Sequence, residues 1–405
     1  MPDRAPSVLP RTLGLTLLVL YGLGVIIGAG IYVLIGTVVG AAGMAAPLSF
    51  VCAGVVAALT GLSYAELAAR FPEAAGAPVY VRHAFGSDRL SQATGVALAA
   101  VLAIGAATIA RGSAGYVHAL LPDLPDGVFG ALVVAVFTAI ACLPVRESVG
   151  IAALITVVEV GGLLFIVVLG TPSLAQLPAH LAEMMPSGAP GWVGVASGAF
   201  LAFFAFIGFE NFANMAEEAK DPARTLPRAI LLSIALSTAL YGAVAIVAVL
   251  AVPLDRLVAA PAPLLLIAEG AAPAAAWVFL PIALFAIANG VLIELLVLAR
   301  LLFGMARRGW LPASLAIVSP RQQTPLRATM VGGAIVLALT ALLDVSALAR
   351  LTSGVTLLVF ALVNAALWRL HRTAPDYAGI IRVPRWVPPV AMAANLLLAA
   401  MALVQ

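Results

Sequence analysis

Paired glycines interrupt an apolar stretch near the N-terminus, at residues 22–32. Gly costs up to about 1 kcal/mol relative to Ala inside a helix, so Gly28 and Gly30 mark a place where a helix unwinds easily. Unwound backbone exposes N–H groups that attract an anion and carbonyl groups that attract a cation. The competing interpretation is that Gly24 and Gly28, four residues apart, form only a close-packing helix face.

A second apolar stretch is broken in a similar way over residues 203–214. Gly208 and Glu210 stand in the middle of this aromatic run, and a charged segment follows it. Interrupted apolar segments at corresponding places in two halves of a chain point to the binding site of a transporter.

Carboxyl and amide groups inside apolar runs form a third candidate set: Glu159, Glu210, Asn289 and Glu294. A charge near the centre of a bilayer costs about 2.5–3.5 kcal/mol, so such residues are candidates for ion or proton coupling. Alternatively, each carboxyl is protonated and hydrogen-bonded between helices, or pairs with a cation.

The composition excludes a soluble protein, because 63% of the 405 residues are hydrophobic, only 10% are charged and mean hydropathy is +1.13. With one Lys and a net charge of +3, no diffuse polycation for nucleic acid is present. Cys52 and Cys142 are too isolated for a disulfide framework or a metal cluster, and the four His are dispersed. We therefore expect no metal and no cofactor.

The sequence predicts a single transmembrane domain over 1–405. A helix needs about 20 apolar residues to cross a bilayer. This length divides the chain into eleven helices near 13–39, 44–69, 90–118, 127–144, 148–170, 192–216, 229–252, 275–303, 327–343, 347–369 and 386–404.

The basic residues predict the orientation of these helices. With the N-terminus in the cytoplasm and the C-terminus outside, 18 of the 21 Lys and Arg residues face the cytoplasm, as the positive-inside rule requires. The asymmetry also explains the basic pI of about 9.1. A patch for anionic lipid is compatible with the same arginines.

The first ten helices form two blocks of five, 13–170 and 192–369, and 386–404 is an extra helix. Five is an odd number, so the second block has the opposite orientation in the membrane. The blocks therefore form an inverted repeat, and the two interruptions fall in the first helix of each.

Four motifs make the chain resemble the amino acid–polyamine–organocation (APC) family of amino acid permeases: IIGAGI at 26–31, YAELAARFPEAAGAPVYV at 64–81, FIGF with EEAKDP and LPR within 203–228, and ARLLFGMARRGWLP at 299–312. The resemblance implies a leucine-transporter-like fold, an all-α integral membrane 5+5 inverted repeat with helices 1 and 6 unwound at the midplane. Helices 3 and 8 would flank the substrate.

Carried over by this resemblance, the carboxylate of an amino acid meets backbone donors around Gly28, Ala29 and Gly30. Its ammonium meets the carbonyls of Phe204, Ala205 and Ile207, and Phe209 lies over the site. A zwitterion also needs such paired helix ends on physical grounds. The full expected substrate-binding set is Ile27, Gly28, Ala29, Gly30, Ile31, Phe204, Ala205, Ile207, Gly208 and Phe209.

Two departures from the family pattern bear on the mechanism. The family usually has one helix more, which leaves the oligomeric interface open. Some relatives also place a helix 5 lysine where sodium would bind, whereas this chain has Glu159. Helix 8 is apolar around Glu294 and lacks a Ser/Thr pair for sodium, which favours proton coupling or exchange.

A cytoplasmic gate is the expected role of Glu66, Glu217, Glu218, Lys220 and Arg228. The alternative is solvated loop charges without an energetic role.

The chain is expected to be a secondary amino acid permease of the cell (inner) membrane and not an enzyme, since no HExxH, GxSxG or phosphate-binding loop is present. Its partners are a small-molecule amino acid, the lipid bilayer and a proton. We expect a small or medium-sized apolar substrate. A polyamine or cationic amino acid transporter, a channel and a non-transporting sensor are the alternatives.

Overall fold

The computed structural model describes residues 13–28, 30–72, 76–117, 126–142, 148–215, 219–319, 324–342, 345–373 and 381–401. Within these ranges the chain is helical and has no β-strand; its one isolated β-bridge joins Leu13 to Ala219. This confirms the all-helical class that the long apolar runs predict.

The long apolar helices lie where the sequence places them. Their bounds are α1 Leu15–Ile27, α2 Gly30–Ala42, α3 Ala46–Arg70, α5 Asp88–Val117, α6 Asp126–Ala141, α7 Ser148–Leu169, α9 Gly188–Ala202, α10 Pro222–Ala251, α13 Pro273–Arg307, α14 Leu326–Leu342, α15 Val345–Thr373 and α16 Val387–Ala400.

Several of these helices are longer than hydrophobicity alone predicts. α10 begins at Pro222 rather than at 229, and α15 ends at Thr373 rather than at 369. The added turns are charged, so a search for apolar runs excludes them. A proline at the first helical position does not interrupt a helix, because that residue's N–H would have no intrahelical partner.

Short helices occupy parts of the chain that the sequence analysis treats as connections. They are α4 Ala77–Phe85, α8 Leu177–His180, α11 Leu254–Ala259 and α12 Pro263–Ala271. α12 and α4 each carry Pro in the first turn. Proline at the first helical positions is compatible with a helix start at these places.

Six helical stretches in the described residues are long and apolar enough to cross a membrane, or seven if the bent pair Leu154–Leu169 and Thr171–His180 forms one span. Four further apolar helices, in α1, α6, α14 and α16, are shorter. Together these are the segments from which the sequence predicts eleven crossings. That count, and the inverted repeat of two five-helix blocks, stay predictions.

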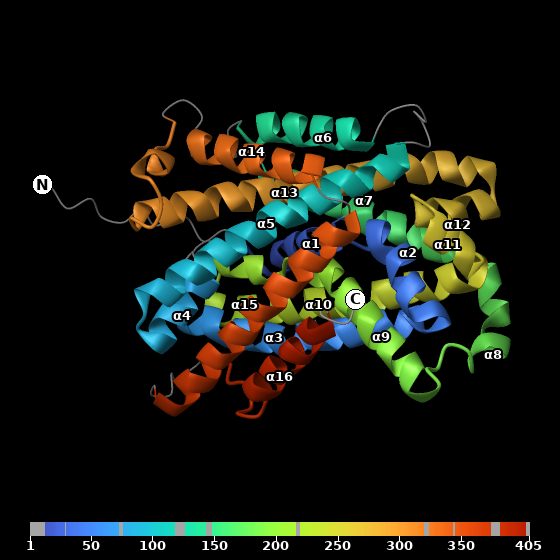
Figure 1. The fold of residues 1–405 in the computed structure, drawn as a ribbon, viewed down its shortest axis with the longest axis horizontal. Helices are drawn as coiled ribbons and strands as arrows, with labels where there is room; N and C mark the ends of the chain where they lie inside the picture. Colours follow the sequence, from blue (N-terminus) through green and yellow to red (C-terminus); the bar gives the residue numbers. More distant parts are fainter. Residues whose placement is uncertain are drawn as a thin grey trace, which may run out of the picture.

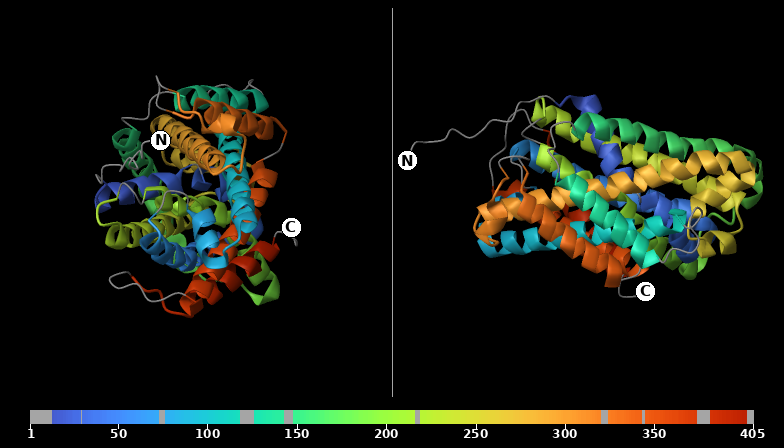
Figure 2. Two further views of the ribbon diagram at one scale, coloured as in Figure 1. Left: turned by 90° about the vertical axis from the view of Figure 1, so that its left-hand side faces the viewer. Right: turned by 90° about the horizontal axis from the view of Figure 1, so that it is seen from above.

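The long helices run roughly along the longest axis of the molecule (Figures 1 and 2). α4 and the C-terminal ends of α13 and α15, which the sequence assigns to the cytoplasm, gather at the left end of Figure 1. α8, α11 and α12, which it assigns to the outside, gather at the right end. This arrangement agrees with alternating crossings, and the membrane face of each end stays a prediction.

The two ends can be assigned to membrane faces with single cysteines in a chain lacking Cys52 and Cys142, the free cysteines of the described residues. Ser187 and Ser314 are both exposed serines, in the 171–191 connection and just after α13. We expect an impermeant maleimide to label Ser187→Cys in intact cells and to label Ser314→Cys only after the cells are opened. The reverse pattern would invert the predicted orientation.

Candidate functional site

The first interruption separates α1 from α2. α1 ends at Ile27, Gly28 has φ 31° and ψ −137°, and α2 begins at Gly30. A side chain at Gly28 would be strained by this positive φ, which explains the glycine. Ala29, an expected carboxylate contact, lies outside the described residues.

The second interruption follows α9. A 3₁₀ turn at Phe203–Phe206 leads to Ile207 in extended conformation and then to Gly208 with φ 130°, and a further 3₁₀ segment covers Phe209–Met215. The N–H of Gly208 donates a 2.8 Å hydrogen bond to the Glu210 carboxylate. Glu210 therefore satisfies the backbone of its own interruption.

The two interruptions pack against each other through their glycines. A Cβ atom on Gly30 would lie 2.6 Å from Cα of Ala205, and one on Gly208 would lie 2.9 Å from the carbonyl oxygen of Val25. Both distances are too short for a real contact. Each broken segment thus needs a glycine where it meets the other.

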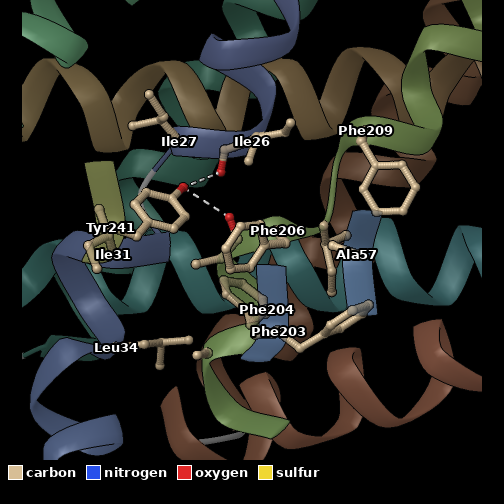
Figure 3. Packing of buried hydrophobic residues seen from close by; sticks show 14 of the residues in the cluster. Ile26, Ile27, Ile31, Leu34, Ala57, Phe203, Phe204, Phe206, Phe209 and Tyr241 are labelled. Atoms are coloured by element: carbon tan, nitrogen blue, oxygen red, sulfur yellow. Dashed lines mark hydrogen bonds between the residues drawn. The ribbon is translucent and has the colours of Figure 1, made fainter. Parts of the chain in front are cut away.

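Tyr241 of α10 joins the same two segments. Its buried hydroxyl lies 2.8 Å from the carbonyl oxygen of Ile26 and 2.9 Å from that of Ala205, and donates to both (Figure 3). A hydroxyl has one proton, so the two carbonyls share it. Sequence analysis missed Tyr241, because a tyrosine within a helical span carries no signal for such a bridge.

A small cavity of about 20 Å³ lies between the interruptions. This volume is enough for about one water molecule. Its walls come from α1, α2, α5, the second interruption, α13 and α15, and consist of Val25, Ile26, Gly28, Gly30, Gly105, Ile109, Phe204, Ile207, Gly290, Ile293, Glu294 and Thr352.

Four expected substrate-binding residues line this cavity: Gly28, Gly30, Phe204 and Ile207. The sequence analysis did not select Gly105, Ile109, Gly290, Ile293 or Thr352. Gly105 and Gly290 carried a signal of their own, since each is a glycine within a long apolar helix. The apolar residues and Thr352 have no such signal.

Other expected contacts lie elsewhere. Ile27 and Ile31 are fully buried in the hydrophobic core. Ala205 faces Gly30, and its carbonyl accepts the bond from Tyr241. Phe209 packs in an aromatic cluster, with ring centroids 5.7 Å from Tyr64 and 5.0 Å from Phe360, so it lies away from the residues that line the cavity.

Two of the expected coupling residues form one buried pair. The amide of Asn289 on α13 donates a 2.8 Å hydrogen bond to Glu159 Oε1 on α7, while Glu159 Oε2 has no partner in the described residues. Tyr32 donates to the main-chain carbonyl of Glu159 at 3.2 Å, and Tyr116 donates to that of Tyr32 at 2.8 Å. Glu159 thus sits at the meeting point of four helices.

Glu294 is the only ionisable residue among the described residues that line the cavity. Its carboxyl lies beside Gly105, where a Cβ atom would be 3.7 Å from the carboxyl carbon. Its Oε2 atom is buried without a hydrogen-bond partner in the described residues. An unpaired buried carboxyl oxygen is costly unless a proton or a ligand cation meets it.

Glu66 does belong to a network at the end expected to be cytoplasmic, but with partners that were not expected. Its carboxylate lies 2.5 Å from Arg70 Nη2 and 2.9 Å from His371 Nε2, and it accepts a bond from the N–H of Val383. Lys220 and Arg228 are exposed and do not join it. Glu217 and Glu218 lie outside the described residues. The described residues contain no cluster of His, Cys, Asp and Glu that could hold a metal ion.

Comparisons with known proteins agree on one family. The amino acid permease family model matches residues 12–405. A vacuolar cationic amino acid transporter of Arabidopsis thaliana is 33% identical over 92% of this chain, which spans 65% of that protein. An uncharacterized transporter of Mycobacterium tuberculosis is 35% identical, with coverages of 90% and 81%. A branched-chain amino acid permease of Bacillus subtilis is 29% identical, with coverages of 93% and 84%.

The first of these relatives extends beyond the matched region by about a third of its length, whereas the bacterial relatives match over most of theirs. The matched region includes both helix interruptions and every residue of the cavity between them. The chain therefore belongs to the amino acid permeases of the APC family.

Proposed function

We propose that this chain is a secondary transporter that carries an amino acid across the cell (inner) membrane by alternating access. One observation carries the proposal: the cavity between the two helix interruptions, where Gly28 and Gly30 of one segment face Phe204 and Ile207 of the other. Membrane-embedded backbone is left irregular only where it is buried in protein or lines a cavity.

An amino acid fits this arrangement because it is a zwitterion. The N–H groups at the start of α2 suit its carboxylate, and the carbonyls near Phe204 and Ile207 suit its ammonium. The carbonyl of Ala205 accepts a bond from Tyr241, and the carbonyl of Phe204 accepts one from the N–H of Ile207. Each oxygen has a second lone pair that can accept from the ammonium.

The present cavity holds about one water, so substrate entry requires the interruptions to move apart. Their contacts are close but consist mainly of glycine packing and the shared proton of Tyr241. A leucine-transporter-like motion would separate these surfaces. It would move predicted helix 1, which covers α1 and α2, and predicted helix 6, which covers α9 and the segment after it.

Proton coupling or exchange is the proposed driving mechanism, with the Glu159–Asn289 pair as the coupling site. The carboxyl bridges α7 and α13 through Asn289, and its other oxygen has no partner in the part of the chain that the structure describes. Adding or removing a proton there changes the bond between the helices.

The substrate class has two candidates. A small or medium-sized apolar amino acid suits Ile109, Phe204, Ile207 and Ile293, and a branched-chain permease is among the relatives. A cationic amino acid or polyamine suits the unpaired Glu294 oxygen, and cationic amino acid transporters are also among the relatives. A non-transporting sensor on the same scaffold would bind its ligand without moving it.

We expect one substrate class to raise the melting temperature of the purified protein in a screen of the twenty amino acids and common polyamines, because a ligand that binds only the native state stabilises it.

Gly30→Leu should abolish this shift and uptake into proteoliposomes, since its side chain would occupy the space of Ala205. Gly161→Leu is the control, because Gly161 is exposed with open space around it. Normal uptake by Gly30→Leu would show that the substrate site does not lie at the first interruption. If the wild type bound a ligand without transporting it, a sensor would be favoured.

Glu294→Gln separates the two substrate classes. If the carboxylate meets a cationic side chain, the variant should bind arginine or a polyamine about tenfold or more weakly, because a charge-assisted hydrogen bond is lost. Binding of alanine or leucine should then change little. Glu159→Gln serves as the control, since Glu159 is a buried carboxyl that does not line the cavity. Unchanged affinity for cations would contradict the cationic assignment.

Glu159→Gln tests coupling. The glutamine resembles the protonated carboxyl, so we expect the variant to bind substrate and to lose most of the pH dependence of transport in proteoliposomes. The wild type should show a single titration. A folded, binding-competent variant with the wild-type pH profile would reduce Glu159 to a structural role and leave Glu294 as the next candidate.

A further inference from the structure

A second hollow lies far from the cavity, between the C-terminal end of α15 and the start of α16. This groove has a volume of about 550 Å³ and is lined by Trp368, His371, Arg372, Arg385 and Trp386. The C-terminal end of α15 and the start of α16 lie at the lower left of Figure 1, at the end expected to be cytoplasmic. None of the groove's residues belongs to the proposed transport site.

The groove is basic and aromatic. The Arg372 guanidinium carbon lies 4.3 Å from the centre of the Trp368 ring, and Arg385 is exposed in the turn before α16. No carboxylate is among the described residues that line the groove. Neither guanidinium has a carboxylate partner among the described residues, and the forked geometry of such groups matches an anion with several oxygens, such as phosphate.

The inner wall of the groove is fixed by buried polar contacts. His371 has only 3% of its side chain exposed and bonds to Glu66, which is itself paired with Arg70. The same carboxylate accepts a bond from the N–H of Val383, two residues before Arg385. The groove is therefore held in shape before any ligand arrives, which lowers the entropy lost on binding.

The surroundings of the groove are those of a membrane interface. Trp386 is 60% exposed at the foot of α16, and the same helix exposes Val390 (45%) and Leu397 (72%) further along. Exposed tryptophan is typical of the headgroup level, and exposed aliphatic side chains beyond it suit acyl chains. Basic pockets between membrane helices on the cytoplasmic side bind anionic headgroups.

We propose that this groove binds an anionic phospholipid. The phosphate of its headgroup lies between Arg372 and Arg385, Trp386 packs against its glycerol region, and its acyl chains run along the exposed face of α16. The proposal requires membrane embedding but not the proposed substrate or coupling mechanism. Residues 374–380, which follow α15 in the sequence, lie outside the described residues.

The test uses the purified, delipidated full chain and titrates it with phosphatidylglycerol or phosphatidylcholine of identical acyl chains, with bound lipid counted by native mass spectrometry. We expect phosphatidylglycerol to bind more tightly. Arg372→Gln and Arg385→Gln should each weaken it about fivefold, in line with the contribution of a basic residue near an anionic lipid surface. Binding of phosphatidylcholine should not change.

Arg308→Gln is the matched control, because Arg308 is an exposed arginine at the end of α13 that lies 5.6 Å from the Trp310 ring. An equal loss in this variant would mean diffuse attraction and overturn the site. So would unchanged binding in both groove variants. Arg385 lies outside the helices, so Arg385→Gln alone keeps the test decisive if Arg372→Gln aggregates.

Inorganic phosphate distinguishes a lipid from a soluble anion. We expect millimolar phosphate to leave the bound phosphatidylglycerol in place, because the acyl chains and Trp386 contribute to its affinity. If phosphate displaced phosphatidylglycerol while the ionic strength was held constant with another salt, the lipid assignment would be overturned. The groove would then be a site for a soluble anion.

Discussion

The need to satisfy backbone polar groups inside an apolar bundle is the constraint on which this structure depends. Breaking α1–α2 and the segment after α9 frees N–H and carbonyl groups where water is scarce, and each unsatisfied group is costly there. Two side chains bond to these freed groups. Tyr241 donates to the carbonyls of Ile26 and Ala205, and Glu210 accepts from the N–H of Gly208. These two side chains therefore satisfy part of the backbone that the interruptions leave unpaired.

The same constraint explains why the carboxyl groups differ in their surroundings. The Glu210 carboxylate accepts a hydrogen bond from the backbone N–H of Gly208. One oxygen of the Glu159 carboxyl accepts a hydrogen bond from the amide of Asn289. Glu294, which lines the cavity, keeps a buried oxygen without a partner among the described residues. Satisfied groups rigidify a core, whereas a partly satisfied one remains available to a ligand or proton. The three residues look alike in sequence, and only their partners separate structural roles from candidate functional ones.

The sequence predicted what depends on local pattern. Apolar runs located the long helices, and the glycines that the sequence analysis selected at 28 and 208 have positive φ. It could not predict the contacts made across hundreds of residues, such as His371 with Glu66 or Tyr241 with Ile26. It also could not orient side chains around the second interruption: Phe209 points to Tyr64 and Phe360 because a 3₁₀ turn rotates it away from the cavity.

The position of Phe209 links the second interruption to the C-terminal part of α3. Phe209 follows directly after Gly208 and packs on Tyr64, which lies two residues before Glu66. Glu66 in turn connects α3 to His371 of α15, while Phe360 of α15 completes the aromatic cluster. A chain of contacts therefore leads from the second interruption through Phe209 and Tyr64 to the α3–α15 contact. Because close-packed interiors do not deform continuously, a separation of the interruptions would act on these contacts as well.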